Sequence, residues 1–326
     1  MTIAPAVSPM ASEATARALA FVASHRDRAE ELGAALAESI NDPDAFAVAL
    51  TAGFGELADP AYRLGQQRVA PGIGAIHGVR GPLLAVVQRG FRGATTGERP
   101  TPLLFLADRL FHERELEARW FAFGLLERTI GTETERTWQL LRRAAREAND
   151  WITIDSLAHP YANGIAAEAY RWAELEQLIY SPSRWERRLV CSTIATMTHG
   201  DRQRGRDPGS ASRALPLLES LMGDAEPDVQ KALAWAYRSL LAVDRSATVA
   251  ALRAETERAV GTDDGHRAWV IRDTLVKLDV ATAAAFRDRL AGIRRRPGAP
   301  ATSSSADTVA RFGQLPEPAT HPEPPL

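Results

Sequence analysis

The 326-residue chain contains one cysteine, Cys191, and almost no lysine. A single cysteine excludes an internal disulfide and every zinc site that needs several thiolates. It lies in the apolar stretch 189–194, and we expect a small core residue there. Lys231 and Lys277 are the only lysines, so arginine carries almost all of the positive charge. Arginine binds phosphate bidentately and stacks on rings, which lysine does not, although a compositional bias of the genome gives the same usage.

A long apolar run is also missing. The longest run near the N-terminus, Ala18–Ala23, is too short for a membrane span or for the apolar part of a signal peptide. We therefore expect a cytoplasmic protein.

Common catalytic signatures are absent too. The sequence has no GxSxG motif, no P-loop and no GxGxxG motif. His112 and Glu113 begin a metalloprotease-like motif, but Leu116 stands where the second histidine is needed. The seven histidines are scattered, which argues against a metalloenzyme. We expect neither a metal nor another cofactor.

Charge and composition favour a helical protein with a basic body. Usage of Ala, Leu, Arg and Glu is heavy, and these residues lose little side-chain freedom in a helix. The net charge is −2, but the acids gather at the two ends. Residues 1–60 carry three arginines against nine acids, and residues 297–326 carry one against three. Residues 61–296 therefore have a net charge of +6.

Breaks in the helical periodicity divide the chain. We expect a flexible N-terminus over 1–11 and an extra N-terminal helix over 12–41. Asp42 or Asp44 is the expected N-cap of a second helix over 45–57. The glycine-rich stretch 72–82 predicts a connection. Further helices are expected over 82–92, 101–109, 112–129, 133–147, 151–164, 166–179, 184–198, 211–222, 227–241, 246–259, 265–278 and 281–293.

Paired amphipathic helices at a spacing of roughly 35–45 residues are typical of a helical-repeat array. No stretch alternates with period two long enough to indicate a sheet. We therefore predict an all-α protein, with one helical-repeat domain over 12–296; a compact irregular helical domain is the alternative. The tail 297–326 is rich in Pro, Ser, Thr and Ala, and we expect it to be disordered.

Three clusters each place a tryptophan three or four residues before an ionisable side chain. They are Trp151-Ile-Thr-Ile-Asp155, Trp185-Glu-Arg-Arg188 and Trp235-Ala-Tyr-Arg238. On a helix this spacing puts both side chains on one face. Three such surfaces fit a partner that is both aromatic and charged, and nucleic acid matches best. Taken singly, each cluster has a structural alternative: a carboxylate bonded to a neighbouring helix, or a core indole beside a surface arginine.

The clusters resemble motifs of the AlkD-type family of DNA alkylation-repair glycosylases, which are built from HEAT-like helical repeats. The first resembles the family's Trp-Asp-x-Val-Asp-Ser, and the second its Trp-x-x-Arg-Ala-Ala. The string from Val229 to Arg238 resembles Ile-Gln-Lys-Ala-Ile-Gly-Trp-x-Leu-Arg almost residue for residue. The likeness covers roughly 45–280. It departs at Ile152, where the family has an acid, and at Ala234, where it has glycine.

The resemblance implies a HEAT-like solenoid whose concave face binds DNA, and a monofunctional glycosylase of base excision repair. It implies that Asp155, Trp151 and Trp235 are catalytic and that Arg188, Arg238 and Trp185 bind DNA. The implied partner is duplex DNA containing N3- or N7-alkylated purines, bound by a monomer. A non-catalytic DNA-binding member of the same superfamily and a protein-binding scaffold remain alternatives.

One histidine, His159, lies close in sequence to the implied catalytic aspartate. His159 follows Asp155 by four residues, on the same face of a helix. Pro160 comes next and should end or distort that helix. We therefore interpret His159 as structural, which leaves no obvious general acid for the release of a neutral base.

Overall fold

The computed structural model describes residues 9–197 and 208–312. These residues form sixteen α-helices, three short 3₁₀ helices and no strand, only two isolated β-bridges. No helix within these ranges is long and apolar enough to cross a membrane. The contacts divide the chain into two compact units, Met1–Ala167 and Glu168–Leu326. The sequence had suggested one repeat domain over 12–296.

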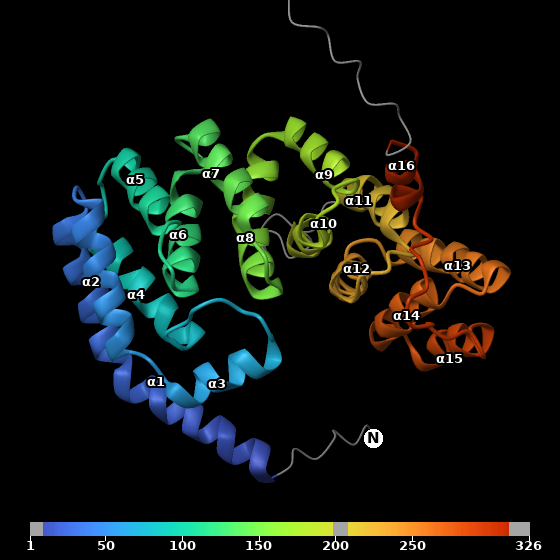
Figure 1. Ribbon diagram of the computed structural model, residues 1–326, viewed down its shortest axis with the longest axis horizontal. Coiled ribbons are helices and arrows are strands. Elements are labelled where there is room, and N and C mark those ends of the chain that lie inside the picture. Colours follow the sequence, from blue (N-terminus) through green and yellow to red (C-terminus); the bar gives the residue numbers. More distant parts are fainter. Residues whose placement is uncertain (1–8, 198–207, 313–326) are drawn as a thin grey trace, which may run out of the picture. The chain divides into compact units, whose positions relative to one another are not determined.

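Eight α-helices and one 3₁₀ helix make up the described part of the first unit (Figure 1). They are α1 (Pro9–Ala35), η1 (Leu36–Ser39), α2 (Pro43–Glu56), α3 (Pro60–Val69), α4 (Gly81–Ala94), α5 (Pro100–Leu110), α6 (Leu116–Thr129), α7 (Thr134–Glu147) and α8 (Trp151–Ala167). Helix α4 packs on α1, and α6 packs on α8, while α5 lies between α2 and α6. These contacts join helices that are adjacent in sequence, such as α5 and α6, and helices two or three places apart, such as α6 and α8.

Close backbone approach joins α1 to α4. A Cβ on Gly90 would lie 2.7 Å from the carbonyl oxygen of Glu30, and a Cβ on Gly33 would clash with the backbone of Val87. Only glycine permits this spacing, since any side chain would force the helices apart. Four rings then fill the core beneath, with Phe121 at its centre, 6.0–6.3 Å from its neighbours. The neighbouring rings are Phe46, Phe54 and Phe91.

Helix α3 was not expected from the sequence. Asp59 caps it by accepting from the amides of Ala61 and Tyr62 at 2.9 and 3.2 Å, and Pro60 occupies the first position. An aspartate followed by proline is a recognised helix start, and this signal could have revealed the helix. Burial by itself would raise the pKa of the Asp59 carboxyl, but hydrogen bonds from Arg80 (2.7 Å) and from the Tyr62 amide lower it.

The connection after α3 is held by one buried carboxylate. Glu117 of α6 accepts from three successive backbone amides, those of His77, Gly78 and Val79, at 2.7–3.2 Å. Gly78 has a φ of +93°, which favours glycine. The expected connection over 72–82 is therefore present, and residues up to 80 belong to it.

The second unit contains the remaining described helices (Figure 1). They are η2 (Ala169–Arg171), α9 (Trp172–Leu178), α10 (Arg184–Met197), α11 (Pro208–Leu221), α12 (Pro227–Leu240), α13 (Arg245–Thr262), α14 (Gly265–Thr274), η3 (Leu275–Lys277), α15 (Val280–Arg289) and α16 (Ser304–Phe312). Helices α10, α12 and α14 pack successively on one another, and so do α11, α13 and α15. These two rows of helices form the layers of the unit.

Polar contacts join each repeat of this unit to the next. Arg188 reaches Asp228, forty residues on; Arg238 reaches Asp273, thirty-five residues on; and Gln230 reaches His266, thirty-six residues on. These separations match the spacing of 35–45 residues expected from the sequence. The prediction of an all-α, helical-repeat fold is confirmed.

The C-terminal prediction was wrong for residues 297–312. The amide of Thr302 donates to the carbonyl of Gly223 at 2.8 Å, and the Thr302 carbonyl accepts from Arg267 at 2.9 Å. A Cβ on Gly223 would clash with Thr302, so glycine allows the close approach. Hydrogen bonds to the backbone, rather than packing of large apolar side chains, fix this segment. The composition of the segment does not reveal such bonds. Residues 313–326 lie outside the described ranges.

Two further parts of that segment are integrated into the unit. Ser303 and Ser305 are buried, and α16 packs against α11. At the other end of the chain, α1 already begins at Pro9, inside the expected flexible stretch; residues 1–8 lie outside the described ranges.

Candidate nucleic-acid interface and active-site residues

Helix α8 begins at Trp151, where the helix expected over 151–164 also begins. The carboxylate of Asp150 accepts from the amide of Thr153 at 2.8 Å, and its backbone carbonyl accepts from the amide of Ile154 at 3.2 Å. Trp151 is the first helical residue, as expected. Asp150 is 4% exposed, so the capping residue is buried, and it fixes the start of the helix.

The structure brings Trp151 and Asp155 together on one helix. Both side chains are partly exposed, whereas Ile154 and Leu157 between and beyond them are fully buried. Four residues along a helix correspond to slightly more than one turn, so Trp151 and Asp155 share a face. That face combines an indole and a carboxylate that solvent can reach.

Pro160 does not end this helix, which was one of the two expected effects of the proline. Helix α8 continues to Ala167, although proline removes one backbone hydrogen bond at a cost of about 3 kcal/mol. Four residues beyond it are buried, namely 161, 162, 164 and 165, and the ring of Tyr161 lies 4.5 Å from that of Trp138 on α7. Burial of this segment offsets the lost hydrogen bond. His159 is exposed.

Arg188 lies in the second unit on α10 and is only 5% exposed. Its Nη1 donates to the backbone carbonyl of Asp228 in the first turn of α12 at 2.5 Å. Trp185, one turn earlier, is half-buried, and Arg184 stacks over its ring at 4.7 Å from the centroid. The alternative of a core indole beside a surface arginine is therefore wrong for this cluster.

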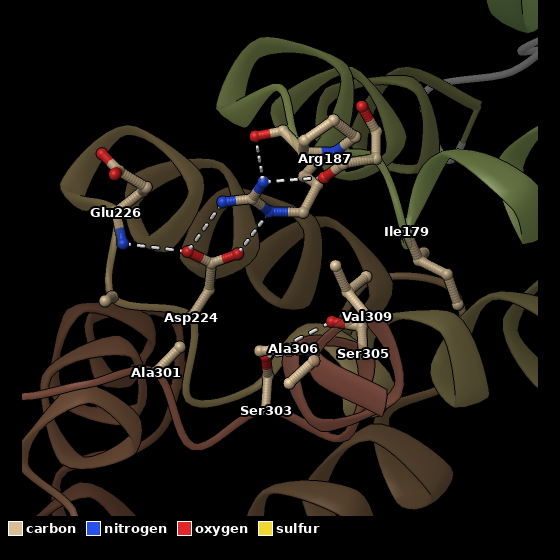
Figure 2. A pocket seen from close by; sticks show the side chains of 13 residues that line it. Ile179, Arg187, Asp224, Glu226, Ala301, Ser303, Ser305, Ala306 and Val309 are labelled. Carbon is tan, nitrogen blue, oxygen red and sulfur yellow. Dashed lines mark hydrogen bonds and ion pairs between the residues drawn. The ribbon is translucent and has the colours of Figure 1, made fainter. Parts of the chain in front are cut away.

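The adjacent Arg187 serves the fold. Its Nε donates to Asp224 at 2.7 Å, and its Nη1 donates to the carbonyls of Ser181 and Pro182 at 2.8 and 3.1 Å. Arg187 lines a pocket of about 360 Å³. Figure 2 shows the guanidinium of Arg187 in this pocket, beside Asp224 and Glu226. Because its donors are used within the protein, Arg187 holds the loops before α10 and α12 together.

The third cluster lies on α12. Trp235 and Arg238 are both half-buried, and Arg238 donates through Nη1 to the carboxylate of Asp273 at 2.5 Å and to its carbonyl at 3.0 Å. Since α10 packs on α12, the four side chains of the second and third clusters lie on neighbouring helices. Trp151 and Asp155 belong to the first unit.

The described residues do not support a metal site or a cysteine nucleophile. They contain no group of His, Cys, Asp and Glu that could hold a metal ion. Cys191 is fully buried, and burial raises the pKa of its thiol far above the ordinary value. It is a core residue, as expected, and not a nucleophile.

Trp120 on α6 was missed by sequence reasoning. Its indole Nε1 donates to the hydroxyl of Thr153 at 3.0 Å, inside the first turn of α8. No motif contains Trp120, and the contact joins residues thirty-three positions apart. Only the packing of α6 on α8 reveals it.

A comparison with known protein families identifies the family to which the chain belongs. The chain matches the family described as DNA alkylation repair enzyme over residues 50–273, more than half of its length. It belongs to that family. The match includes all three clusters, and the chain has a role in the repair of alkylated DNA. No match was found among curated proteins.

Proposed function

We propose that the protein is a DNA glycosylase that releases positively charged N3- and N7-alkylated purines from duplex DNA. The observation that supports this most is the start of α8, where a capped first turn presents Trp151 and Asp155 on one partly exposed face. The family match supplies the DNA-repair context.

The chemistry needs little more than a fixed carboxylate. A purine alkylated at N3 or N7 carries a formal positive charge, so its glycosidic bond is already weakened and the base leaves without protonation. The developing charge then resides on the sugar as an oxocarbenium ion. Asp155 stabilises this ion by its negative charge and orients the attacking water.

The remaining residues bind DNA in this proposal. Trp151 and Trp235 contact the deoxyribose and the cationic base through their ring faces, each contact contributing about 0.5–2 kcal/mol. Arg188 and Arg238 bind phosphates and set the register of the backbone, with Trp185 beside them. The protein acts as a cytoplasmic monomer without a cofactor.

One assay tests the assignment directly. A duplex containing N7-methylguanine is incubated with the protein and free base is measured, in parallel with duplex affinity. We expect release by the native protein and a loss of about a hundredfold or more for Asp155→Asn, which keeps the shape but removes the charge. Affinity for DNA should stay within about twofold. Asp44→Asn, which alters an exposed carboxylate of the same unit, should release base normally.

Equal release by Asp155→Asn and the native protein would remove Asp155 from the mechanism. Salt-sensitive duplex binding without any release would favour the non-catalytic alternative. The absence of both would favour a protein-binding scaffold.

Lesion charge gives an independent test. N3-methyladenine and N7-methylguanine should be released, whereas the neutral bases uracil and hypoxanthine should remain almost untouched. Release of neutral bases that disappears in His159→Ala would instead make His159 a general acid.

A further inference from the structure

A part-buried side-chain hydrogen bond joins helices α6 and α8 of the first unit. The indole Nε1 of Trp120 donates to Oγ1 of Thr153 at 3.0 Å, and Thr153 is 5% exposed. The partly buried indole N–H of Trp120 has the buried threonine hydroxyl as its acceptor. The bond therefore links α8 to its neighbour at a defined point in its first turn.

The same threonine is also held through its backbone. Its amide donates to the carboxylate of Asp150 at 2.8 Å. Thr153 is thus fixed at its main chain by the helix cap and at its side chain by Trp120. Thr153 and its cap Asp150 lie within the six residues 150–155, which also contain Trp151 and Asp155.

Helix geometry places these contacts behind the candidate catalytic face. Each residue advances by about 100°, so Trp151 and Asp155 share one face, while Thr153 lies about 200° from each of them. Burial agrees with this, since Thr153 is buried and the other two are partly exposed. The hydrogen bond to Trp120 therefore opposes rotation of the helical turn that presents Asp155.

Trp120 is firmly held in helix α6 because the next residue in sequence belongs to the hydrophobic core. Phe121, next to Trp120, is fully buried, and its ring contacts three other phenylalanine rings. The far end of α8 is held as well: a Cβ on Gly164 would lie 2.8 Å from the ring of Trp138. The helix is thus tightly packed at both ends, and the bond to Trp120 holds the end with Asp155.

We propose that Thr153 and Trp120 are positioning residues that fix the orientation of Asp155 for base release. This inference rests on the proposed glycosylase function. A fixed charge stabilises a transition state only if its direction is set before the reaction, and a displacement of about 1 Å can reduce the rate about a hundredfold. Neither residue needs to touch the DNA.

The first experiment removes the hydroxyl while keeping the side-chain shape. Thr153→Val should lower the single-turnover rate of N7-methylguanine release about tenfold and leave duplex affinity within about twofold. Thr153→Ser retains the hydroxyl and should restore the rate to within about twofold of the native value. A purely structural role would not separate rate from affinity in this way.

The second experiment removes the same bond from its other end. Trp120→Phe deletes the N–H donor and should also slow release without weakening duplex binding. The double variant Trp120→Phe, Thr153→Val should be no slower than the slower single variant, because only one bond exists to be lost. Multiplied losses would mean that the two residues act independently, which contradicts the proposal.

The possible outcomes separate this inference from the proposed function. If the native protein releases no base, the glycosylase assignment and the inference both fail. If it releases base and Thr153→Val does so at the native rate, the inference alone fails. Loss of affinity in parallel with rate, or a defect that Thr153→Ser does not rescue, would also overturn it.

Discussion

Arg238 and Asp273 form an ion pair between neighbouring repeats, with Nη1 of the arginine 2.5 Å from Oδ2 of the aspartate. The side chains are 23% and 44% exposed, so solvent and salt weaken the attraction. The same guanidinium is the one expected to bind a DNA phosphate. Asp273 and the phosphate would therefore compete for it.

Asp273→Asn should strengthen duplex binding by a factor of about 1.4 to 5, because an exposed ion pair contributes about 0.2–1 kcal/mol that no longer opposes DNA. Fluorescence anisotropy with an undamaged duplex would measure the change. In the double variant Arg238→Ala, Asp273→Asn the gain should vanish. If it persists there, the smaller negative charge of the protein explains it without Arg238.

Arg238→Ala should flatten the dependence of duplex affinity on salt. Each phosphate contact contributes about 0.9 to the slope of log affinity against log salt concentration, so one lost contact removes about that amount. Arg245→Ala is the matched control, since Arg245 lies on α13 in the other layer of the unit and pairs only weakly with Asp279, at 3.5 Å.

Arg188→Ala should flatten the slope by a similar amount. Because Arg188 is buried and bonded to the Asp228 carbonyl, the thermal stability of this variant must be measured alongside. Unchanged slopes in both arginine variants would show that the two guanidinium groups only join repeats.

Removal of the C-terminal segment should destabilise the second unit. Two truncations, after residue 312 and after residue 296, differ only in residues 297–312. The shorter chain loses the Thr302 carbonyl that accepts from Arg267, and a hydrogen bond to a charged group contributes about 1.5–3 kcal/mol. Its midpoint of thermal unfolding should be several degrees lower. Equal midpoints would show that the segment contributes no stability.

Asp59→Asn should change how stability depends on pH. Asparagine still caps α3, but it loses the ion pair with Arg80, in which Nη2 lies 2.6 Å from the carboxylate. The pKa of Asp59 is lowered in the folded protein, so its contribution is present above the unfolded value of about 3.9 and is lost as pH falls through the folded pKa.

Urea unfolding at pH 7 and at about pH 3 would measure this effect. The native protein should exceed the variant by about 1–2 kcal/mol at pH 7 and by less at low pH. Asp44→Asn, at a carboxylate that is 84% exposed, should change little at either pH. A constant difference between the native protein and Asp59→Asn would mean that the carboxyl charge does not stabilise the fold.

Local signals in the sequence determined most of the helices. Capping residues act within one turn: Asp42, one of two expected candidates, caps α2, and Asp150 caps α8 at its predicted start. The missed α3 had the same kind of signal in Asp59-Pro60. The spacing of apolar residues likewise predicted repeats, and contacts between residues 35–40 positions apart confirm that spacing in the second unit.

The sequence also identified the candidates for catalysis, through the resemblance of the Trp151–Asp155 string to the family motif. Their spacing fixes a shared helical face whatever surrounds it. Tertiary structure decided the contacts of those residues. Three contacts join residues more than thirty positions apart: Arg188 with Asp228, Arg238 with Asp273, and Trp120 with Thr153. Such contacts depend on which helix faces meet, and no local pattern encodes that. The order of residues 297–312 has the same origin, since acceptors and a glycine far away in sequence hold a segment that has little apolar surface of its own.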